Sequence, residues 1–187
     1  KTIYLIRHAE STGQQPDGAL SDLEKNRRRI WWHVCVSKPR WGNLKPLCAG
    51  YGNHLALFDG AGLDIQTDLD LDLDLDLAER QLKPFDLQLP FDDLMHHLRL
   101  SFEKWDYKIE GGESLNDIKR CALRALKKIV QSDFERPIVA AHGNLIAAVL
   151  GAIDPDFGFE QWCAMKNPHL YCLLCAGDAP VLFEDLD

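Results

Sequence analysis

Two histidines in this sequence each follow a short apolar run. The run Thr2–Ile6, rich in β-branched and aromatic residues, leads directly into Arg7 and His8. The run Pro137–Ala141 leads in the same way into His142. Such runs are typical of buried strands, and α/β sheets bind ligands just beyond the carboxyl ends of their strands. The sequence therefore predicts a site to which two strands deliver one histidine each.

These residue types suit phosphoryl transfer. A neutral histidine held through one ring nitrogen is a nucleophile towards phosphorus. Negative charge develops on the phosphoryl oxygens during transfer, and the planar guanidinium of Arg7, next to His8, suits that charge. The alternatives are structural: a core His8 that bonds to backbone, and a His142 that caps the helix starting near Asn144.

Three motifs occur in a fixed order along the chain: R-H-A-E-S from Arg7, G-G-E-S from Gly111 and H-G-N from His142. Together they resemble the histidine phosphatase superfamily, to which phosphoglycerate mutases also belong. The resemblance spans roughly residues 1–24 and 77–168. It implies a phosphoglycerate mutase-like α/β fold, a three-layer αβα sandwich around a mostly parallel central sheet. A length of 187 residues with 46% apolar content fits a single domain over residues 1–187.

The resemblance also implies catalytic roles. His8 is expected to be the nucleophile, and His142 to bind the transferring phosphoryl oxygens beside it. Glu79, in Leu-Ala-Glu-Arg, resembles the family's proton donor. A positioned carboxylic acid contributes typically ~10²–10⁴-fold to such a step. The alternative for Glu79 is a surface ion pair with Arg80. The rival acid is Glu113, for which a structural role at the mouth of the site is the other interpretation.

Phosphate and substrate contacts are expected from Arg7 and Arg40, with Ser11, Gln14 and Glu113 as weaker candidates. Arg40 ends a Ser-Lys-Pro-Arg stretch that is the nearest match to the family's second phosphate-binding arginine motif. The residues around it depart from the family pattern. Loss of a phosphate-binding arginine leaves developing charge uncompensated, so an inactive phosphate-binding family member is one alternative function.

The expected activity is that of a metal-independent phosphatase without a cofactor. It hydrolyses a phosphomonoester, on a phosphorylated small molecule or a phosphoprotein, through a phosphohistidine on His8. Phosphoglycerate mutase-type transfer is the second hypothesis. The sequence does not indicate an oligomeric state or a particular substrate, because substrate choice resides in loops.

Amino-acid composition limits the classes of partner that the protein is expected to bind. The net charge of −8 argues against nucleic acid and anionic membranes, which need a basic surface, but allows an anionic substrate in a locally basic cleft. No apolar run approaches the roughly 20 residues that cross a bilayer, and no signal peptide is expected. The six cysteines are scattered, so we expect reduced thiols and a cytoplasmic protein. Cys172 and Cys175 form a C-x-x-C pair that is expected on opposite faces of one strand.

Five consecutive Asp-Leu pairs occupy Asp68 to Leu77. Strict alternation predicts an edge strand with leucines inward and aspartates outward. A calcium site is an alternative, although the glycine and the ligand spacing of a calcium loop are missing. A third hypothesis is that the tract departs from the protein's natural sequence, which intact-mass measurement and peptide sequencing would reveal.

Other patterns predict the remaining elements. A helix is expected after Ser21-Asp22-Leu23-Glu24, and Ser114 with Asp117 predicts a capping box that opens a long helix. The further expected elements are a strand at His33–Ser37, a helix at Leu94–Lys104, and strands at Leu170–Leu174 and Val181–Phe183 around a Gly177-Asp178 turn.

Overall fold

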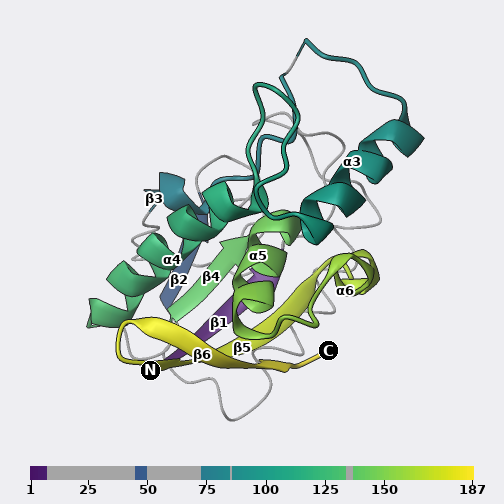
Figure 1. Cartoon of the computed structure of the whole chain (residues 1–187). Coiled ribbons are helices and arrows are strands. Elements are labelled where there is room, and N and C mark those ends of the chain that lie inside the picture. Colours follow the sequence, from purple (N-terminus) through teal and green to yellow (C-terminus); the bar gives the residue numbers. More distant parts are fainter. Residues whose placement is uncertain (8–44, 50–72, 85, 134–136) are drawn as a thin grey trace, which may run out of the picture.

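Six strands form one mixed sheet in a computed structural model that describes residues 1–7, 45–49, 73–84, 86–133 and 137–187 (Figure 1). Their order across the sheet is β3-β2-β4-β1-β5-β6. The strands are β1 (Thr2–Arg7), β2 (Lys45–Ala49), β3 (Leu73–Asp74), β4 (Pro137–Ala141), β5 (His169–Ala176) and β6 (Ala179–Asp185).

The strand directions divide the sheet into two parts. β1 pairs in parallel with β4, β2 with β4, and β2 with β3. β5 is antiparallel to β1 and β6 is antiparallel to β5, so the C-terminal side of the sheet is a hairpin. The expected α/β fold is confirmed, but the sheet is less uniformly parallel than expected because this hairpin extends it.

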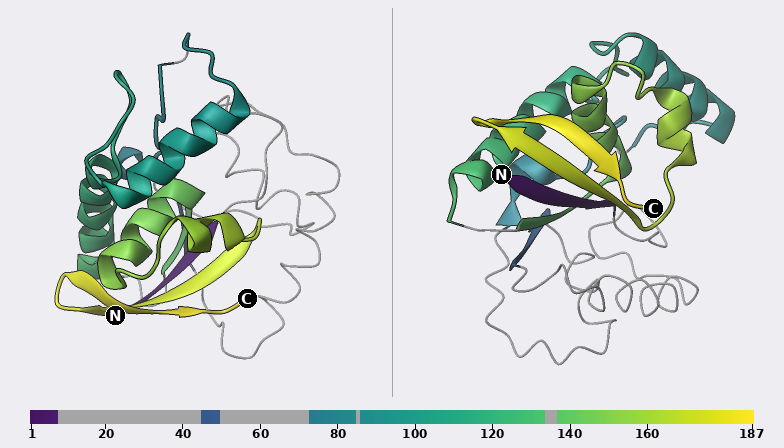
Figure 2. Two further views of the ribbon diagram at one scale, coloured as in Figure 1. Left: turned by 45° about the vertical axis from the view of Figure 1, so that its right-hand side comes forward. Right: turned by 90° about the horizontal axis from the view of Figure 1, so that it is seen from below.

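Two long helices, α4 (Leu115–Gln131) and α5 (Gly143–Ile153), lie on the same face of the sheet (Figures 1 and 2). α5 is buried from Asn144 through Leu150 and is apolar on nearly every side. That composition fits a helix enclosed between a sheet and a second helix. α3 (Phe91–Glu103) contacts the short α6 (Phe159–Ala164), since the ring of Phe102 lies against Phe159 and Trp162. The helix expected after Ser21 and the strand expected at His33–Ser37 lie outside the described residues.

The start of α4 is fixed by contacts within four residues. The Ser114 hydroxyl accepts a hydrogen bond from the Asp117 backbone N–H at 3.1 Å. The Asp117 carboxylate accepts one from the Ser114 N–H at 2.9 Å. The expected capping box is therefore confirmed. From this start, Leu115, Ile118 and Leu126 place a buried stripe against α5 and the sheet.

The acidic tract is not one continuous strand. Residues 68–72 lie outside the described part, and only Leu73–Asp74 is a strand, at the edge of the sheet. The chain then forms a 3₁₀ turn, η1 (Leu75–Leu77), in which Leu75 is 74% exposed and Leu77 is 1% exposed. The expectation that every leucine points inward is therefore wrong for Leu75. The reason is local: the Asp74 side chain accepts a hydrogen bond from the Asp76 N–H at 2.9 Å and so caps the turn.

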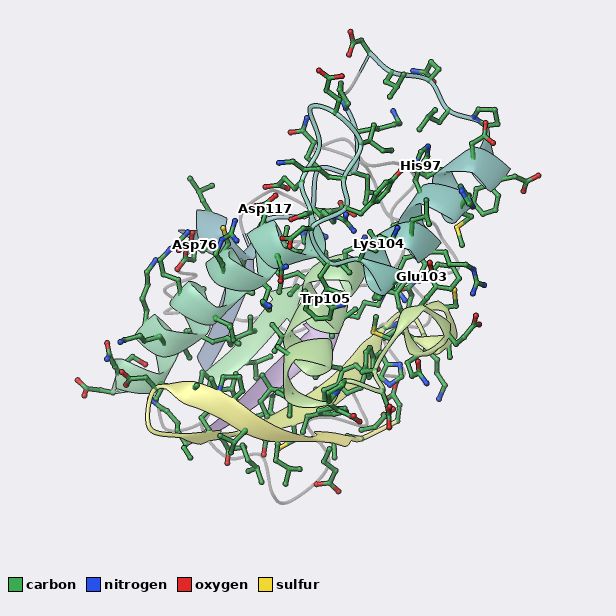
Figure 3. All side chains as sticks on the ribbon, in the orientation of Figure 1. Asp76, His97, Glu103, Lys104, Trp105 and Asp117 are labelled. Carbon is green, nitrogen blue, oxygen red and sulfur yellow. The ribbon has the colours of Figure 1, made fainter. Side chains whose placement is uncertain are left out.

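Basic side chains of α4 neutralise the two aspartates of this turn. Arg124 Nε donates to an Asp76 carboxylate oxygen at 2.8 Å. Lys128 Nζ lies 3.0 Å from Asp74 and 3.1 Å from Asp76. Figure 3 shows Asp76 beside α4. Both aspartates of the turn are therefore paired with basic side chains of α4.

The helix and hairpin expected near the C-terminal half are confirmed with longer boundaries. α3 begins at Phe91, and the hairpin of β5 and β6 turns at Gly177, whose φ is +60°. In β5, Cys175 packs against the core with Leu173, whereas Leu174 between them is 43% exposed. Cys121, Cys163, Cys172 and Cys175 are not in disulfides. Among the described helices, none is both long and apolar enough to span a bilayer.

Candidate active site

The two strands that were expected to deliver the histidines are neighbours. Arg7 is the last residue of β1 and lies opposite Ala141, the last residue of β4. On its other side it lies opposite His169 of β5. Since β1 and β4 are parallel, Arg7 and His142, which follows Ala141, emerge at the same edge of the sheet.

The Arg7 guanidinium lies between two backbone segments. Its Nη1 donates a hydrogen bond to the Met165 carbonyl oxygen at 2.7 Å. On the other side it touches Gly143, the first residue of α5, where an added Cβ would lie 3.0 Å from Nε and 3.1 Å from Cζ. Glycine at this position therefore lets the guanidinium lie directly against the helix.

His142 is the N-cap residue of α5, but its ring is not the cap. Its backbone carbonyl accepts the N–H of Ile146 at 2.9 Å, and its side chain makes no capping hydrogen bond. The alternative in which the ring caps the helix is wrong. The residue is 8% exposed, and its Nδ1 lies 3.6 Å from a carboxylate oxygen of Glu79. That distance is an electrostatic contact and is too long for a hydrogen bond.

Glu79 has an environment that favours the protonated form of its carboxyl group more than water does. Its side chain is 40% exposed, but protein crowds the remaining sides. This burial raises the pKa of Glu79, and the positive charge of Arg7 opposes the rise only in part. The alternative surface ion pair with Arg80 is wrong, because Arg80 is 5% exposed and donates to the Glu113 carbonyl and the Ser101 hydroxyl instead.

Both sides of Glu79 are anchored. Two residues before it, Leu77 is fully buried in the core. Two residues after it, the Gln81 N–H donates to a Glu113 carboxylate oxygen at 2.7 Å, and the Glu113 N–H donates to the Gln81 carbonyl at 2.8 Å. Gly112 permits this pairing, since a Cβ there would lie 2.5 Å from the Leu82 carbonyl oxygen. Glu113 thus contacts the segment that carries Glu79; its expected contact with substrate stays a prediction.

Four of the expected site residues lie outside the described residues: His8, Ser11, Gln14 and Arg40. Their roles stay predictions. Within the described residues, Arg7, Glu79 and His142 come together at one edge of the sheet. The Met165 carbonyl could not be predicted from residue types, because any residue supplies a backbone acceptor. In the described part of the chain, no group of three or more metal-ligating side chains is placed to hold an ion.

This arrangement has a definite chemical capacity. A guanidinium at a strand end and a buried imidazole can hold an oxyanion. A carboxyl group whose pKa is raised can deliver a proton beside them. The described side chains therefore suit a reaction in which a bound oxyanion changes its charge while a neighbouring oxygen is protonated.

Comparisons with known proteins identify the family and show which solved structures share the fold. The sequence profile of the histidine phosphatase superfamily (branch 1) matches residues 61–184. A search of curated proteins found no match.

Three solved structures share the fold. Mycobacterial glucosyl-3-phosphoglycerate phosphatase has a TM-score of 0.74 at 19% identity and covers 99% of this chain and 97% of its own. Phosphoglycerate mutase from Bacillus anthracis str. Sterne has a TM-score of 0.77 at 13% identity, with coverage of 99% and 92%. The α-ribazole phosphatase from Shigella flexneri has a TM-score of 0.68 at 14% identity, with coverage of 97% and 94%.

Proposed function

This chain belongs to the histidine phosphatase superfamily, and on that premise we propose that it is a metal-independent phosphatase that hydrolyses a phosphomonoester through a phosphohistidine on His8. The observation that carries the proposal is the convergence of Arg7, Glu79 and His142 at the edge where β1 leads into His8. A phosphorylated small molecule is the favoured substrate class, since the phosphatases with this fold are named for such compounds.

In the proposed first step, a ring nitrogen of His8 attacks phosphorus and the ester P–O bond breaks. Arg7 and His142 compensate the negative charge on the phosphoryl oxygens. The leaving oxygen takes the proton of Glu79, whose raised pKa keeps that proton available at higher pH than for an ordinary glutamate. The products of this step are a free alcohol, phosphohistidine and a Glu79 carboxylate.

In the second step, water attacks the phosphohistidine and the P–N bond breaks. The Glu79 carboxylate takes a proton from that water, which restores the acid and releases inorganic phosphate. The electron pair of the P–N bond returns to the His8 ring. Each group thus ends the cycle in its starting state, and no external co-reactant besides water is consumed.

We assign Glu113 a positioning role in this scheme. Its carboxylate and its backbone both bond to Gln81, and its carbonyl accepts from Arg80. These contacts fix the chain directly after Glu79. A displacement of the acid by about 1 Å can lower the rate by ~10²-fold, so the hydrogen bonds of Glu113 to Gln81 and Arg80 support the proton transfer by keeping Glu79 in place.

The test compares two substrates of different leaving-group demand, with EDTA present. An alkyl phosphate such as glycerol phosphate needs a proton on its leaving oxygen, whereas p-nitrophenolate leaves without one. Because kcat/KM reports on the steps up to P–O cleavage and not on hydrolysis of the phosphohistidine, Glu79→Gln is expected to lower kcat/KM of the alkyl phosphate by ~10²–10⁴-fold and that of p-nitrophenyl phosphate much less. Glu110→Gln, an exposed glutamate in the neighbouring loop, is the matched control.

The pH dependence follows from the same carboxyl group. The acid form of Glu79 is lost as pH rises through its raised pKa, so kcat/KM of the alkyl phosphate should fall on the alkaline side, and this fall should be absent in Glu79→Gln. His8→Ala should abolish turnover and the acid-labile phosphoenzyme. An active His8→Ala protein, or equal losses of kcat/KM for both substrates in Glu79→Gln, would contradict the mechanism.

The product formed from 3-phosphoglycerate distinguishes the mutase alternative from the phosphatase. With 3-phosphoglycerate as substrate, a phosphatase releases inorganic phosphate and glycerate, whereas a mutase yields 2-phosphoglycerate. An inactive family member would release no phosphate from any of the three substrates. The same incubations therefore distinguish all three hypotheses.

A further inference from the structure

A small, open pocket lies between α3 and the segment that follows Glu79. Whereas Glu79 approaches His142 at the start of α5, the next side chain, Arg80, reaches Ser101 on α3. Arg80 lines the pocket together with polar groups from two other segments, namely His97, Tyr107 and Lys108. The pocket is thus a separate site next to the proposed acid.

Arg80 brings to this pocket a positive charge that no described carboxylate contacts directly. The residue is 5% exposed, and both of its hydrogen-bond acceptors are uncharged: the Glu113 carbonyl at 2.9 Å from Nε and the Ser101 hydroxyl at 3.0 Å from Nη1. In the described part of the chain, no carboxylate forms an ion pair with it. Burial lowers the pKa of the Arg80 guanidinium to about 10, so it remains charged at neutral pH. A buried charge of this kind is costly without a partner.

The nearby carboxylates are already engaged. The Glu113 carboxylate accepts the Gln81 N–H, and the Asp117 carboxylate accepts the Ser114 N–H and pairs with Lys108 at 3.4 Å. Both act on Arg80 only from a distance. A ligand that supplies a carboxylate would therefore give the Arg80 guanidinium the ion pair that the described carboxylates do not form.

The rest of the lining defines what else the ligand should contain. Leu94 and Leu98 of α3 form an apolar wall. On the same helix, His97 Nδ1 is hydrogen-bonded to the Tyr107 hydroxyl, and the two rings stack with centroids 5.9 Å apart (Figure 3 shows His97 on α3). This pair is fixed before any ligand binds. The site combines a cation, a rigid polar pair and an apolar wall. Its enclosed space is about the size of one water molecule, so most of any ligand lies in its open mouth.

We propose that this pocket binds the carboxylate of a short organic acid. The carboxylate pairs with Arg80 and Lys108, and the alkyl stem lies on the leucines of α3. The acid is either a free ligand or the carboxylate end of the phosphorylated substrate; the second source rests on the proposed function. In both cases the ligand contacts the residue next to Glu79.

The first experiment titrates butyrate into the full chain and follows the His97 imidazole by NMR, with the resonance assigned through its loss in His97→Gln. A saturable shift is expected with butyrate and none with butanol. Lys108→Met should weaken butyrate binding about five- to tenfold, because it removes one charge-assisted contact. Lys104→Met, an exposed lysine at the end of α3 that does not line the pocket, should bind like wild type. A folded wild-type protein with no saturable shift, or with the same shift for butanol, overturns the proposal.

The second experiment separates the two sources of the carboxylate. If the substrate supplies it, Lys108→Met raises KM about five- to tenfold for 3-phosphoglycerate and leaves KM unchanged for p-nitrophenyl phosphate, which has no carboxylate. If a free acid supplies the carboxylate, KM is unchanged for both substrates, and the saturable shift of the His97 resonance with butyrate is still observed. Absence of any phosphatase activity in wild type counts against the proposed function, whereas the butyrate titration still decides the pocket.

Discussion

Gly143→Ala is expected to separate catalysis from stability. The new Cβ would lie 3.0 Å from Nε, 3.1 Å from Cζ and 3.2 Å from Nη2 of Arg7. An ordinary contact between such atoms begins at about 3.5 Å, so the guanidinium has to retreat by roughly 0.3–0.5 Å. Its hydrogen bond to the Met165 carbonyl holds it from the other side and is stretched by that movement.

The size of the effect follows from this displacement. A misplacement of about 1 Å in a reactive site can lower the rate by ~10²-fold. A displacement of about half that size therefore corresponds to about a tenfold loss in kcat/KM. Stability should change little. Alanine favours a helix over glycine by up to about 1 kcal/mol, and the weakened hydrogen bond costs about 1 kcal/mol.

The assay measures kcat/KM on p-nitrophenyl phosphate and the melting temperature by circular dichroism. The control is Gly158→Ala, where the nearest atom to an added Cβ is Gln161 Oε1 at 3.7 Å. This variant should keep its activity. A Gly143→Ala protein whose kcat/KM stays within about threefold of wild type would refute the claim that the contact with Arg7 sets the guanidinium position.

Two further predictions concern the turn that precedes Glu79. Leu77→Ala should lower the free energy of unfolding by about 2–5 kcal/mol in urea, while Leu75→Ala, at an exposed position of the same turn, should stay within about 0.5 kcal/mol; equal losses would contradict the burial difference. The pKa of Asp76 lies at about 2, below its ordinary 3.8, because Arg124 and Lys128 bond to it. Its contribution to stability is therefore present above pH 3.8 and lost as pH falls through 2, so Asp76→Asn should lower the urea midpoint at pH 7 and much less at pH 2.

Features set by neighbours in the sequence could be predicted. The apolar runs that end at Arg7 and Ala141 are strands that end there, and the edge at which they meet follows from parallel pairing. The start of α4 follows from Ser114 and Asp117, which bond to each other three residues apart. These signals need no knowledge of distant segments.

Features set by distant segments could not be predicted. Alternating Asp and Leu fits a strand, but Asp also caps turns, and the ion pairs that accompany the turn come from Arg124 on α4, 48 residues away. The Arg7 contact with the Met165 carbonyl joins residues 158 apart and leaves no pattern in residue types. The alternative that places Arg80 in a surface ion pair follows from the rarity of buried arginine, and only the packing against α3 reveals that Arg80 is buried.

The place of β1 in the middle of the sheet has a consequence for how the protein is made. Its partners on either side, β4 and β5, follow it by about 130 and about 165 residues. At a ribosomal rate of about 5–20 residues per second, the first strand waits on the order of ten seconds or longer for either neighbour. Throughout that interval the apolar segment Thr2–Arg7 has neither of its edges covered by β4 or β5. A chain released before residue 137 would lack both neighbours, which makes prematurely ended chains of this protein candidates for chaperone binding or aggregation.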